Sequence, residues 1–509
     1  MEELYQSTNQ KTDFLRSRGY TVVTLWEHAY IEMLANDVGF REFVVGNTDI
    51  VDGIDPRDAF FGGRTNAIKL HHVVENDERI KYIDICSLYP FVNKHCSYPI
   101  GHPIIVTENF KAISDYYGIV KCVVLPPREL FLPVLPYRSP DSKLTFPLCR
   151  TCCDTMQQHE RCRHADEERC ITGTWVTVEL MAAIRRGYRI VRVNEVWHWE
   201  ERETGLFAQY IDKFLKIKVE ANGWPENVKT DADKSRFVKA YKDREGVEIE
   251  CEKVCFNPGL RAVSKLCLNS MWGRLGIKPN KTQTKFVSEP FELNDMLLSD
   301  DVEVSDVIIL NEELLKVQFK NTREFVTPDS KSNVVLAAFT TAHARLKLYS
   351  YIEPLDSRVL YMDTDSVIYI AKPGMYDPPT GIFLGDMTDE LEGDYGVGSY
   401  ITEFVSGGAK NYAYKVKSTK YNTEKTVCKV KGICLNFRNS QLINFDSMRD
   451  IVVSGRNNDD DPITVINPSA IQRDTKNYIV RSAIERKRYR IVYTKRAFLD
   501  NHRTLPYGY

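Results

Sequence analysis

Three aspartates have the side chains and the positions that a metal site for phosphoryl transfer needs. Asp84 lies near the end of the apolar segment IKYIDI, and Asp363 and Asp365 flank a threonine within RVLYMDTDSVIYI. Carboxylate oxygens suit Mg²⁺, and transfer of a phosphoryl group to a hydroxyl gains from two such ions about 3.5–4 Å apart. We therefore expect Asp84 to lie beside the acidic pair, although an acidic turn is more often a solvated β-turn.

A second group of polar residues recurs with helical spacing. In NPGLRAVSKLCLNSMWGRLG, Arg261, Lys265 and Asn269 are four residues apart, so they share one helical face within an arc of about 80°. Two cations and an amide on one face suit a triphosphate and the edge of a base or sugar, and Gly273 permits close approach of a nucleic-acid strand. The alternative is an ordinary amphipathic helix whose basic face is exposed to solvent.

Four residues have the spacing of a zinc knuckle. They are Cys149 and Cys152, separated by two residues, and Cys162 and His164, separated by one. Three thiolates and an imidazole suit tetrahedral Zn²⁺, and such an ion would be structural because four protein ligands leave no open position. Buried free thiols are the equally weighted alternative.

The elements that position the aspartates follow from the pattern of apolar residues. A strand is expected at 80–85, and it breaks into a turn and a second element at 88–91. A helix is expected at 333–351, followed by a hairpin at 357–370 with Asp363 and Asp365 at its tip. Two β-elements would thus bring the three acids together.

The rest of the chain reads as helices with short strands between them. A helix beginning at Thr174 or Thr177 precedes a strand at 188–196. Two further helices, at 205–218 and 258–275, are expected to form an antiparallel hairpin. Residues 281–333 are expected to form short strands and turns.

Composition favours an intracellular globular enzyme. The chain has 509 residues, of which 43% are hydrophobic and 27% charged, enough for roughly three or four subdomains. No stretch reaches the about 18 consecutive apolar residues of a membrane span, and no signal peptide opens the sequence, so we expect no membrane partner. The net charge is −2, so any contact with nucleic acid must use local cations, which gather at 410–431 and 473–496.

Several motifs, taken together and in this order, resemble those of family B DNA polymerases. Residues 84–90 (DICSLYP) resemble the family's DxxSLYP, residues 265–273 (KLCLNSMWG) its KxxxNSxYG, and residues 361–366 (YMDTDS) its YxDTDS. Residues 60–63 (FFGG) and 410–412 (KNY) resemble the YxGG and KxY elements of the protein-primed branch, which is found in viruses, linear plasmids and self-synthesising mobile elements. The resemblance covers roughly residues 55–509.

The resemblance implies an α+β fold of the right-hand polymerase type, with a palm built on a mixed or antiparallel sheet, helical fingers, a thumb and two insertions. In the protein-primed branch these insertions contact the priming protein and encircle DNA. The implied division of the chain is an N-terminal remnant at 1–54, the first part of the palm with an insertion at 55–204 (including the knuckle at 149–170), fingers at 205–280, the second insertion at 281–332, the second part of the palm at 333–430 and the thumb at 431–509.

The resemblance also implies a role for individual residues. Asp84 and Asp365 would bridge both metals with help from the backbone of Ile85, and Asp363 would support them. Tyr89 would exclude ribonucleotides by colliding with a 2′ hydroxyl. Trp272 replaces the tyrosine of many relatives, and we expect activity to be retained. The remaining implied contacts are to the nucleotide (Ser87, Leu88, Arg261, Lys265 and Asn269) and to DNA (Gly62, Gly63, Ser270, Gly273, Lys410 and Tyr412).

The implied activity is template-directed addition of deoxynucleotides to a 3′ hydroxyl with two Mg²⁺ ions, for which Mn²⁺ is an alternative. Primer–template DNA and deoxynucleoside triphosphates would be the partners, and a terminal protein would supply the primer. No Asp-x-Glu occurs in residues 1–54, so we expect a chain without proofreading exonuclease activity.

Two other functions compete with this interpretation. A reverse transcriptase or RNA polymerase would also carry paired acids, but reverse transcriptases place two adjacent aspartates at the hairpin tip, whereas Thr364 separates them here. A catalytically silent DNA-binding relic of a mobile element is the second alternative. The presence of all three acids together with Lys265 and Tyr89 argues against it.

Overall fold

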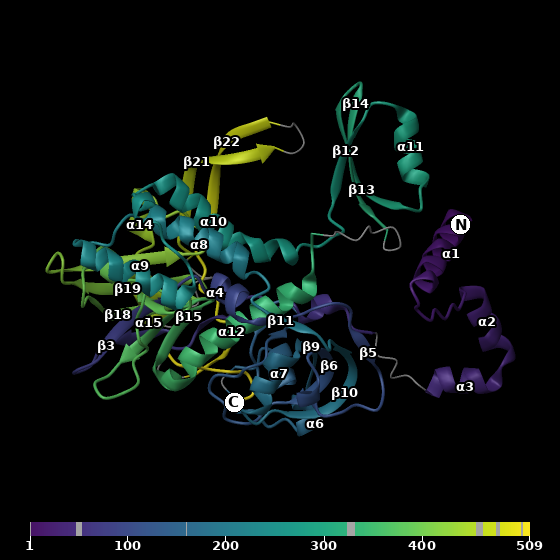
Figure 1. Cartoon of the computed structure of the whole chain (residues 1–509), viewed down its shortest axis with the longest axis horizontal. Helices are drawn as coiled ribbons and strands as arrows, with labels where there is room; N and C mark the ends of the chain where they lie inside the picture. Colours follow the sequence, from purple (N-terminus) through teal and green to yellow (C-terminus); the bar gives the residue numbers. More distant parts are fainter. Residues whose placement is uncertain are drawn as a thin grey trace. The chain divides into compact units, whose positions relative to one another are not determined.

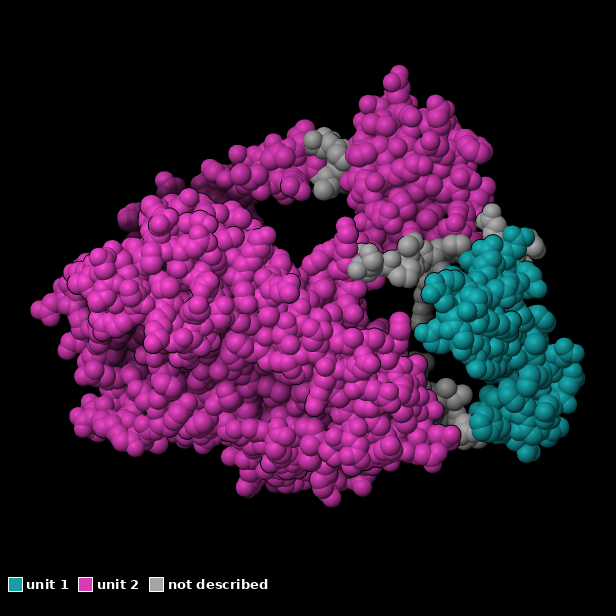
Figure 2. Space-filling view, in the orientation of Figure 1, with its two compact units in different colours: residues 1–53 teal, residues 54–509 magenta. Residues whose placement is uncertain are grey.

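The computed structural model describes residues 2–46, 53–158, 160–322, 331–454, 462–474, 479–499 and 502–509. The chain divides into two compact units, residues 1–53 and 54–509, which Figure 2 colours separately. The first unit contains three helices, α1 (Glu2–Ser17), α2 (Glu27–Asn36) and α3 (Val38–Gly46), and none of its described side chains is buried.

The second unit is organised around a nine-stranded antiparallel sheet in which strands from distant parts of the chain alternate (Figure 1). Seven of the strands follow one another in a single row, with β3 at the centre between β16 and β18. The other two are β17, which pairs with β3, and β2, which pairs with β18. In spatial order the main strands are β1 (Thr65–Ala67), β15 (Val359–Asp363), β16 (Ser366–Ala371), β3 (Arg79–Ile85), β18 (Tyr400–Gly408), β19 (Asn411–Ser418) and β20 (Thr423–Val430), with β17 (Met387–Asp389) and β2 (His71–Val73) beside them.

Both faces of this sheet are covered, which explains why its central strands are apolar throughout. Successive side chains of a strand point to opposite faces. Ile83 and Ile85 of β3 join the core that contains helix α12 (Val334–Leu355), whereas Ile80 and Tyr82 join the core that contains helix α15 (Phe445–Ser454). The expected strand at 80–85 and hairpin at 357–370 are both present, and α12 runs four residues beyond its expected end.

A smaller antiparallel sheet packs into the same core as α12. Its order is β5 (Ile104–Val106), β10 (Arg189–His198), β6 (Gly118–Leu125) and β9 (Ile171–Val176). Helix α7 (Thr177–Ile184) follows β9 directly, so of the two expected helix starts Thr177 is correct and Thr174 lies in a strand. Trp175 of β9 is fully buried and donates its indole N–H to the carbonyl of Pro136, 2.9 Å away.

Three helices follow. α8 (Ala208–Ala221) and α10 (Pro258–Leu275) pack antiparallel: the Tyr210 hydroxyl donates to the carbonyl of Cys267 at 3.1 Å, and the amide of Asn257 donates to the carbonyl of Ala221 at 2.9 Å. The predicted helical hairpin is therefore present. Between its arms the structure adds helix α9 (Asp231–Glu245), which the sequence reasoning missed.

The segment after α10 forms a sheet of its own with the order β12–β14–β13. It contains β12 (Gln283–Val287), β13 (Val302–Asn311) and β14 (Leu314–Asn321), and also a helix, α11 (Pro290–Leu298), where only strands and turns were expected. Near the end of the chain, β21 (Thr464–Asp474) and β22 (Ile479–Arg488) form a hairpin.

The remaining elements are short. No helix within the described ranges is long and apolar enough to cross a membrane. The short elements are η1 (Pro56–Ala59), α4 (Leu88–His95), β4 (Ser97–Pro99), η2 (Ile113–Asp115), β7 (Tyr137–Arg138), β8 (Leu144–Thr145), α5 (Arg150–Asp154), α6 (Asp166–Arg169), β11 (Arg202–Thr204), η3 (Cys251–Lys253), η5 (Asp356–Arg358), α13 (Glu392–Tyr395), α14 (Phe437–Leu442), β23 (Ala497–Phe498) and β24 (Thr504–Leu505).

Candidate active site

The three predicted acids meet at one end of the central strands. Asp84 on β3 pairs in register with Ser366 on β16, and the amide of Ile85 donates to the carbonyl of Asp365 at 2.8 Å. The turn between β15 and β16 is tight: Thr364 has a φ of +62°, and the amide of Asp365 donates to the carbonyl of Asp363 at 2.7 Å. The strand register thus places Asp84 beside the acidic turn.

Asp84 and Asp365 form a pair of carboxylates that resist ionisation. Burial raises the pKa of Asp84 to about 8, with the negative charges of Asp365 and Glu390 as further causes. Burial also raises the pKa of Asp365 to about 6, and the charge of Asp363 adds to the effect. Two such neighbouring groups are a natural binding place for a divalent cation, whose charge removes the penalty of ionising both.

Asp363 is held differently, because the chain itself balances its charge. The Lys410 Nζ donates to both oxygens of its carboxylate, at 2.8 and 2.9 Å, and the Thr65 hydroxyl donates to Oδ1 at 2.8 Å. Lys410 has a φ of +59°, and its amide donates to the hydroxyl of Tyr361 at 2.8 Å. Asp363 therefore has a supporting position, and Lys410 is fixed next to the acids at both its backbone and its side chain.

Residues Ser87 to Tyr89 form the start of helix α4. Ser87 has a left-handed backbone with φ +51°, and the first intrahelical bond is donated by Phe91 to the carbonyl of Ser87 at 2.9 Å. The backbone amides of Leu88 and Tyr89 lie before Phe91, the first residue that donates a hydrogen bond within the helix. Amides in this position at the start of a helix are favourable donors to phosphate oxygens. The side chain of Ile85 is buried, which leaves its backbone as the part that a metal ion could meet.

The basic residues of α10 are exposed and directed to the same region. Arg261, Lys265 and Asn269 are all exposed, and Lys265 lies close enough to Asp84 to counteract part of the rise in its pKa. The Arg261 Nε donates to the side-chain oxygen of Asn222 at 2.5 Å. Ser270 and Gly273 are also exposed, and a Cβ added to Gly273 would meet no atom within 4 Å.

A third cation, which sequence reasoning missed, comes from α8. The Lys218 Nζ donates to the hydroxyl of Ser87 at 3.2 Å. Burial lowers its pKa, and the nearby charges of Lys265 and Arg261 lower it further. Three cations from two helices thus converge beside the start of α4. The packing of α8 beside α4 brings Lys218 there, and no spacing in the sequence indicates that contact.

Tyr89 lies near Asp365 and packs against α10. Its ring stacks on the indole of Trp272, with ring centroids 4.3 Å apart and an interplanar angle of 22°. Burial and the charge of Asp365 raise the pKa of Tyr89 to about 12, so it remains a neutral phenol.

Gly63 lies against the acidic turn. The amide of Thr364 donates to the carbonyl of Arg64 at 2.7 Å, and a Cβ on Gly63 would come within 2.8 Å of the Thr364 side chain. The glycine segment is held by Arg345 of α12, whose Nη1 donates to the carbonyls of Phe61 and Gly62 at 2.9 and 3.0 Å.

Arg345 is itself fixed by a buried ion pair that no pattern in the sequence indicates. Its Nε and Nη2 donate to the two carboxylate oxygens of Glu179 on α7, at 2.8 and 2.7 Å. The side chains of Arg345 and Glu179 are 3% and 1% exposed, so the pair is shielded from water. Helices α7 and α12 and the glycine segment are therefore joined through one guanidinium group.

Tyr412, predicted to contact DNA, lies in the core instead of at the surface. It is 6% exposed, its ring centroid is 4.8 Å from that of Tyr361, and its hydroxyl is 3.2 Å from the hydroxyl of Tyr82. Its position supports the strand that begins at the Lys410 turn.

Glu390 is a further carboxylate that was not predicted. It follows β17, where Thr388 pairs with Asp84 and donates its hydroxyl to the Asp84 carbonyl at 3.1 Å. Glu390 is exposed, and its charge helps to raise the pKa values of both Asp84 and Asp365. No motif marks this residue, since β17 reaches β3 only through the fold.

The two basic stretches of the sequence meet at a cavity of about 510 Å³ beside the Lys410 turn. Lys495 lines it and donates its Nζ to the carbonyl of Thr65 at 3.2 Å. The cavity therefore adjoins β1, the strand whose Thr65 hydroxyl donates to Asp363. The other basic lining residues are Lys143, Lys431, Lys487, Arg488, Arg490 and Arg496. Such a concentration of cations suits a phosphate backbone.

The predicted zinc-knuckle residues lie apart from the acids, and their three cysteines belong to a core cluster of their own. Cys149, Cys152, Cys162 and His164 are brought together, with their ligand atoms all within 4.8 Å of one another. Cys153 is buried nearby but is not part of this group.

The chain is similar to known polymerases. A family model described as DNA polymerase type B, organellar and viral, matches residues 42–234 and 250–357, together more than half of the chain. A curated protein of Neurospora intermedia called "Probable DNA polymerase" is 23% identical over 320 residues, which cover 61% of this chain and 26% of that protein. The chain therefore spans about a quarter of that relative's length.

Solved structures of phi29 DNA polymerase have a similar fold. The complex with primer-template DNA and incoming nucleotides is 15% identical, with a TM-score of 0.52 over 94% of this chain and 69% of the other. The complex with single-stranded DNA is 14% identical, with a TM-score of 0.53 and the same coverage. This likeness confirms the predicted α+β fold of the right-hand polymerase type.

Proposed function

Because the chain belongs to the organellar and viral type B DNA polymerases, we propose that it is a template-directed DNA polymerase that adds deoxynucleotides to a 3′ hydroxyl. The observation that carries the proposal is the meeting of Asp84 and Asp365 at one end of β3 and β16, with both pKa values raised and with Lys265 of α10 nearby. That arrangement suits two-metal phosphoryl transfer onto a hydroxyl.

Polymerases of this family use divalent metal ions, and Mg²⁺ fits the residues present, since Asp84, Asp365 and the backbone of Ile85 offer oxygen ligands. We propose that Asp84 and Asp365 hold two Mg²⁺ ions, or Mn²⁺ in their place, with the backbone of Ile85 and with Glu390 nearby. When bound, the ions would lower the pKa of the attacking hydroxyl and stabilise the leaving phosphate. Asp363, held by Lys410, would keep the acidic turn in place.

The incoming nucleotide is proposed to lie between α4 and α10. The amides at the start of α4 and the cations Lys218, Lys265 and Arg261 would hold the triphosphate. The Tyr89 ring would then lie under the sugar and exclude a 2′ hydroxyl by its volume, and Asn269 would line the new base pair.

DNA is proposed to follow the Lys410 turn and the basic cavity beside it. The cavity's lysines and arginines would neutralise backbone phosphates near the primer end. Gly62 and Gly63 would direct the template strand, with Ser270 and Gly273 on the exposed face of α10. Tyr412 would act through the strand it supports, since its own side chain is buried.

The finer assignments from the sequence stay predictions. They are a terminal priming protein as partner, contact of the insertions at 55–204 and 281–332 with that protein and with DNA, an intracellular location and the division into palm, fingers and thumb.

Primer extension on a recessed DNA template with Mg²⁺ tests the proposal. The wild-type chain should extend the primer with deoxynucleotides, and Asp365→Asn, which keeps the shape of the side chain but removes its charge, should abolish extension. Asp243→Asn is the matched control, because Asp243 is exposed on α9 and belongs to none of the groups described above. Extension that persists in Asp365→Asn would refute the metal site.

The same experiment separates the proposal from the silent relic. A well-folded wild-type chain that binds primer–template DNA but gives no extension with either Mg²⁺ or Mn²⁺ would favour a DNA-binding protein without activity.

A further inference from the structure

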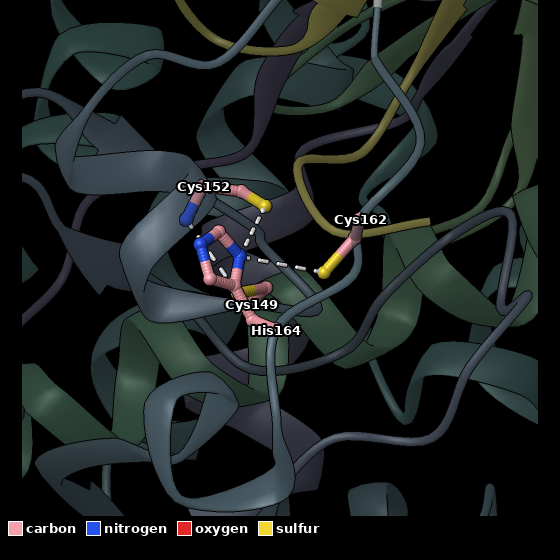
Figure 3. A group of neighbouring side chains, drawn as sticks. All are labelled: Cys149, Cys152, Cys162 and His164. Carbon is pink, nitrogen blue, oxygen red and sulfur yellow. Dashed lines mark hydrogen bonds between the residues drawn. The ribbon is translucent and has the colours of Figure 1, made fainter.

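We propose that Cys149, Cys152, Cys162 and His164 bind one structural Zn²⁺ ion, and that this ion holds residues 502–509 against the rest of the second unit. The four side chains come from α5, its N-cap and the loop that follows (Figure 3). This site lies apart from the acids and requires nothing of the proposed polymerase activity.

The distances match a tetrahedral site. The Nδ1 of His164 lies 3.5 Å from the sulfur of Cys149, 3.2 Å from that of Cys152 and 3.6 Å from that of Cys162. With a Zn–S bond of about 2.3 Å and a Zn–N bond of about 2.0–2.1 Å, tetrahedral angles place nitrogen and sulfur about 3.5 Å apart. Figure 3 shows the imidazole of His164 among the three thiol groups.

The local backbone fixes the position of the Cys149 sulfur. Cys149 is the N-cap of α5, and its sulfur accepts a hydrogen bond from the amide of Cys152 at 3.5 Å. This contact holds the first two ligand residues in one compact turn. The exposed fractions of the three ligand cysteines are 0%, 2% and 8% in sequence order, so their sulfurs are shielded from solvent, whereas His164 is half-buried.

The ligand set selects zinc over the Mg²⁺ of the acidic site. Three sulfurs and one imidazole nitrogen form a closed Cys₃His set, which is typical of structural zinc and leaves no position open for a substrate. Cys153 is excluded as a ligand because its sulfur lies 3.3 Å from the hydroxyl of Thr145, outside the group of four.

The knuckle is also the surface on which the end of the chain lies. The amide of Leu148 donates to the carbonyl of Tyr507 at 2.7 Å, and Tyr507 is 1% exposed in one cluster with the four cysteines at 149, 152, 153 and 162. Gly508, at φ +86°, approaches so closely that an added Cβ would lie 2.3 Å from that of Cys149. Any larger residue at position 508 would displace the knuckle.

The same segment continues to the edge of the central sheet. The amide of Thr504 donates to the carbonyl of Ile68 at 3.0 Å, and the amide of Leu70 donates to the carbonyl of His502 at 2.7 Å. These contacts flank β1, whose Thr65 donates to Asp363. A zinc ion at the knuckle would therefore stabilise the strand that borders the acidic turn, by fixing the segment that packs against both.

Metal analysis of the full chain, purified under reducing conditions without chelator, tests the site directly. The wild-type protein should retain about one zinc per chain, and Cys149→Ser and Cys162→Ser should each lose most of it. Cys153→Ser is the matched control, since this buried neighbour lies outside the ligand set. Wild-type protein without zinc, or equal zinc content in Cys153→Ser and Cys162→Ser, would overturn the proposal.

A second measurement uses only the wild-type chain, so it does not depend on whether a variant folds. Cobalt loaded into the wild-type chain should give the visible absorption of a tetrahedral ion together with thiolate charge transfer, whereas the weak spectrum of an octahedral ion would overturn the proposed ligand set. Release of the metal should accelerate hydrogen exchange in peptides containing Leu148 and Thr504. Unchanged exchange in both peptides would overturn the proposed link to residues 502–509.

Discussion

The ring of Tyr89 on α4 lies against the indole of Trp272 on α10, with centroids 4.3 Å apart. This stack joins the helix that follows Asp84 to the helix that carries Lys265. It also places an aromatic wall directly beside the carboxylates, since the charge of Asp365 contributes to the raised pKa of Tyr89. Aromatic pairs of this kind contribute about 0.5–1.5 kcal/mol beyond their buried area.

Replacing Tyr89 by alanine should weaken discrimination against ribonucleotides. Without the ring, a 2′ hydroxyl meets open space, so the ratio of kcat/KM for deoxynucleotides to that for ribonucleotides should fall by about ten- to a hundredfold. Steady-state incorporation of a single nucleotide measures this ratio. Tyr89→Phe is the control, because it keeps the ring and should keep the discrimination; equal ratios in Tyr89→Ala and wild type would exclude Tyr89 as the steric gate.

Gly63→Ala should disable the acidic turn while Gly62→Ala is tolerated. A Cβ at position 63 would approach the Thr364 side chain to 2.8 Å, whereas one at position 62 would meet only Leu144 at 4.0 Å. Displacing the turn by about 1 Å would lower the extension rate about a hundredfold. Extension rates and melting temperatures of the two variants measure this difference, and similar activity in both would show that the turn yields without consequence.

Glu179→Gln should destabilise the second unit strongly. The substitution leaves the buried guanidinium of Arg345 without a counter-charge, and breaking a buried pair costs about 3–5 kcal/mol of unfolding free energy. Urea unfolding measures the change. Glu248→Gln removes a carboxylate from an exposed ion pair with Lys242 and should have no measurable effect. A Glu179→Gln variant as stable as that control would mean that the buried pair is dispensable.

The free energy of unfolding without metal should fall with rising pH, and Mg²⁺ should oppose this fall. In the folded chain the pKa of Asp84 is raised from 3.8 to about 8, and that of Asp365 from 3.8 to about 6. For each residue, between its ordinary pKa and its raised pKa, the folded state binds more protons than the unfolded state. The free energy of unfolding therefore declines as pH increases through that range. Mg²⁺ neutralises the ionised pair, and its stabilising effect should therefore grow over the same range.

Melting temperatures at about pH 5.5 and about pH 8.5, with and without Mg²⁺, measure this linkage. The shift caused by Mg²⁺ should be larger at the higher pH, and it should shrink in Asp365→Asn. A Mg²⁺ shift that does not change with pH would contradict the assignment of the two carboxylates as ligands.

The sequence predicted the elements that carry their own local signals. The strand before Asp84, the hairpin around Asp363 and Asp365 and the helix at 258–275 all have apolar patterns or caps of their own, and the structure contains each of them. α10 even has the predicted bounds, because Asn257 caps it and Pro258 fits its first position.

What the sequence could not predict depends on packing between distant segments. Lys218 reaches Ser87 only because α8 packs beside α4, and Arg345 contacts Glu179 only across two helices far apart in the chain. The burial of Tyr412 could not be predicted for the same reason. Its strand, β19, lies between β18 and β20, and the local sequence does not indicate either neighbour. α11 was missed because strands and turns dominate the segment around it.

The hydrogen bond between Thr65 and Asp363 joins residues 298 positions apart in the chain. Such a contact requires closure of a very long loop, whose entropic cost must be met before the contact itself contributes any stability. The acidic site therefore cannot assemble in any short segment of a growing or refolding chain. It forms together with the central sheet, so partly folded molecules present the sheet's unpaired strand edges to one another before the acidic site can bind metal.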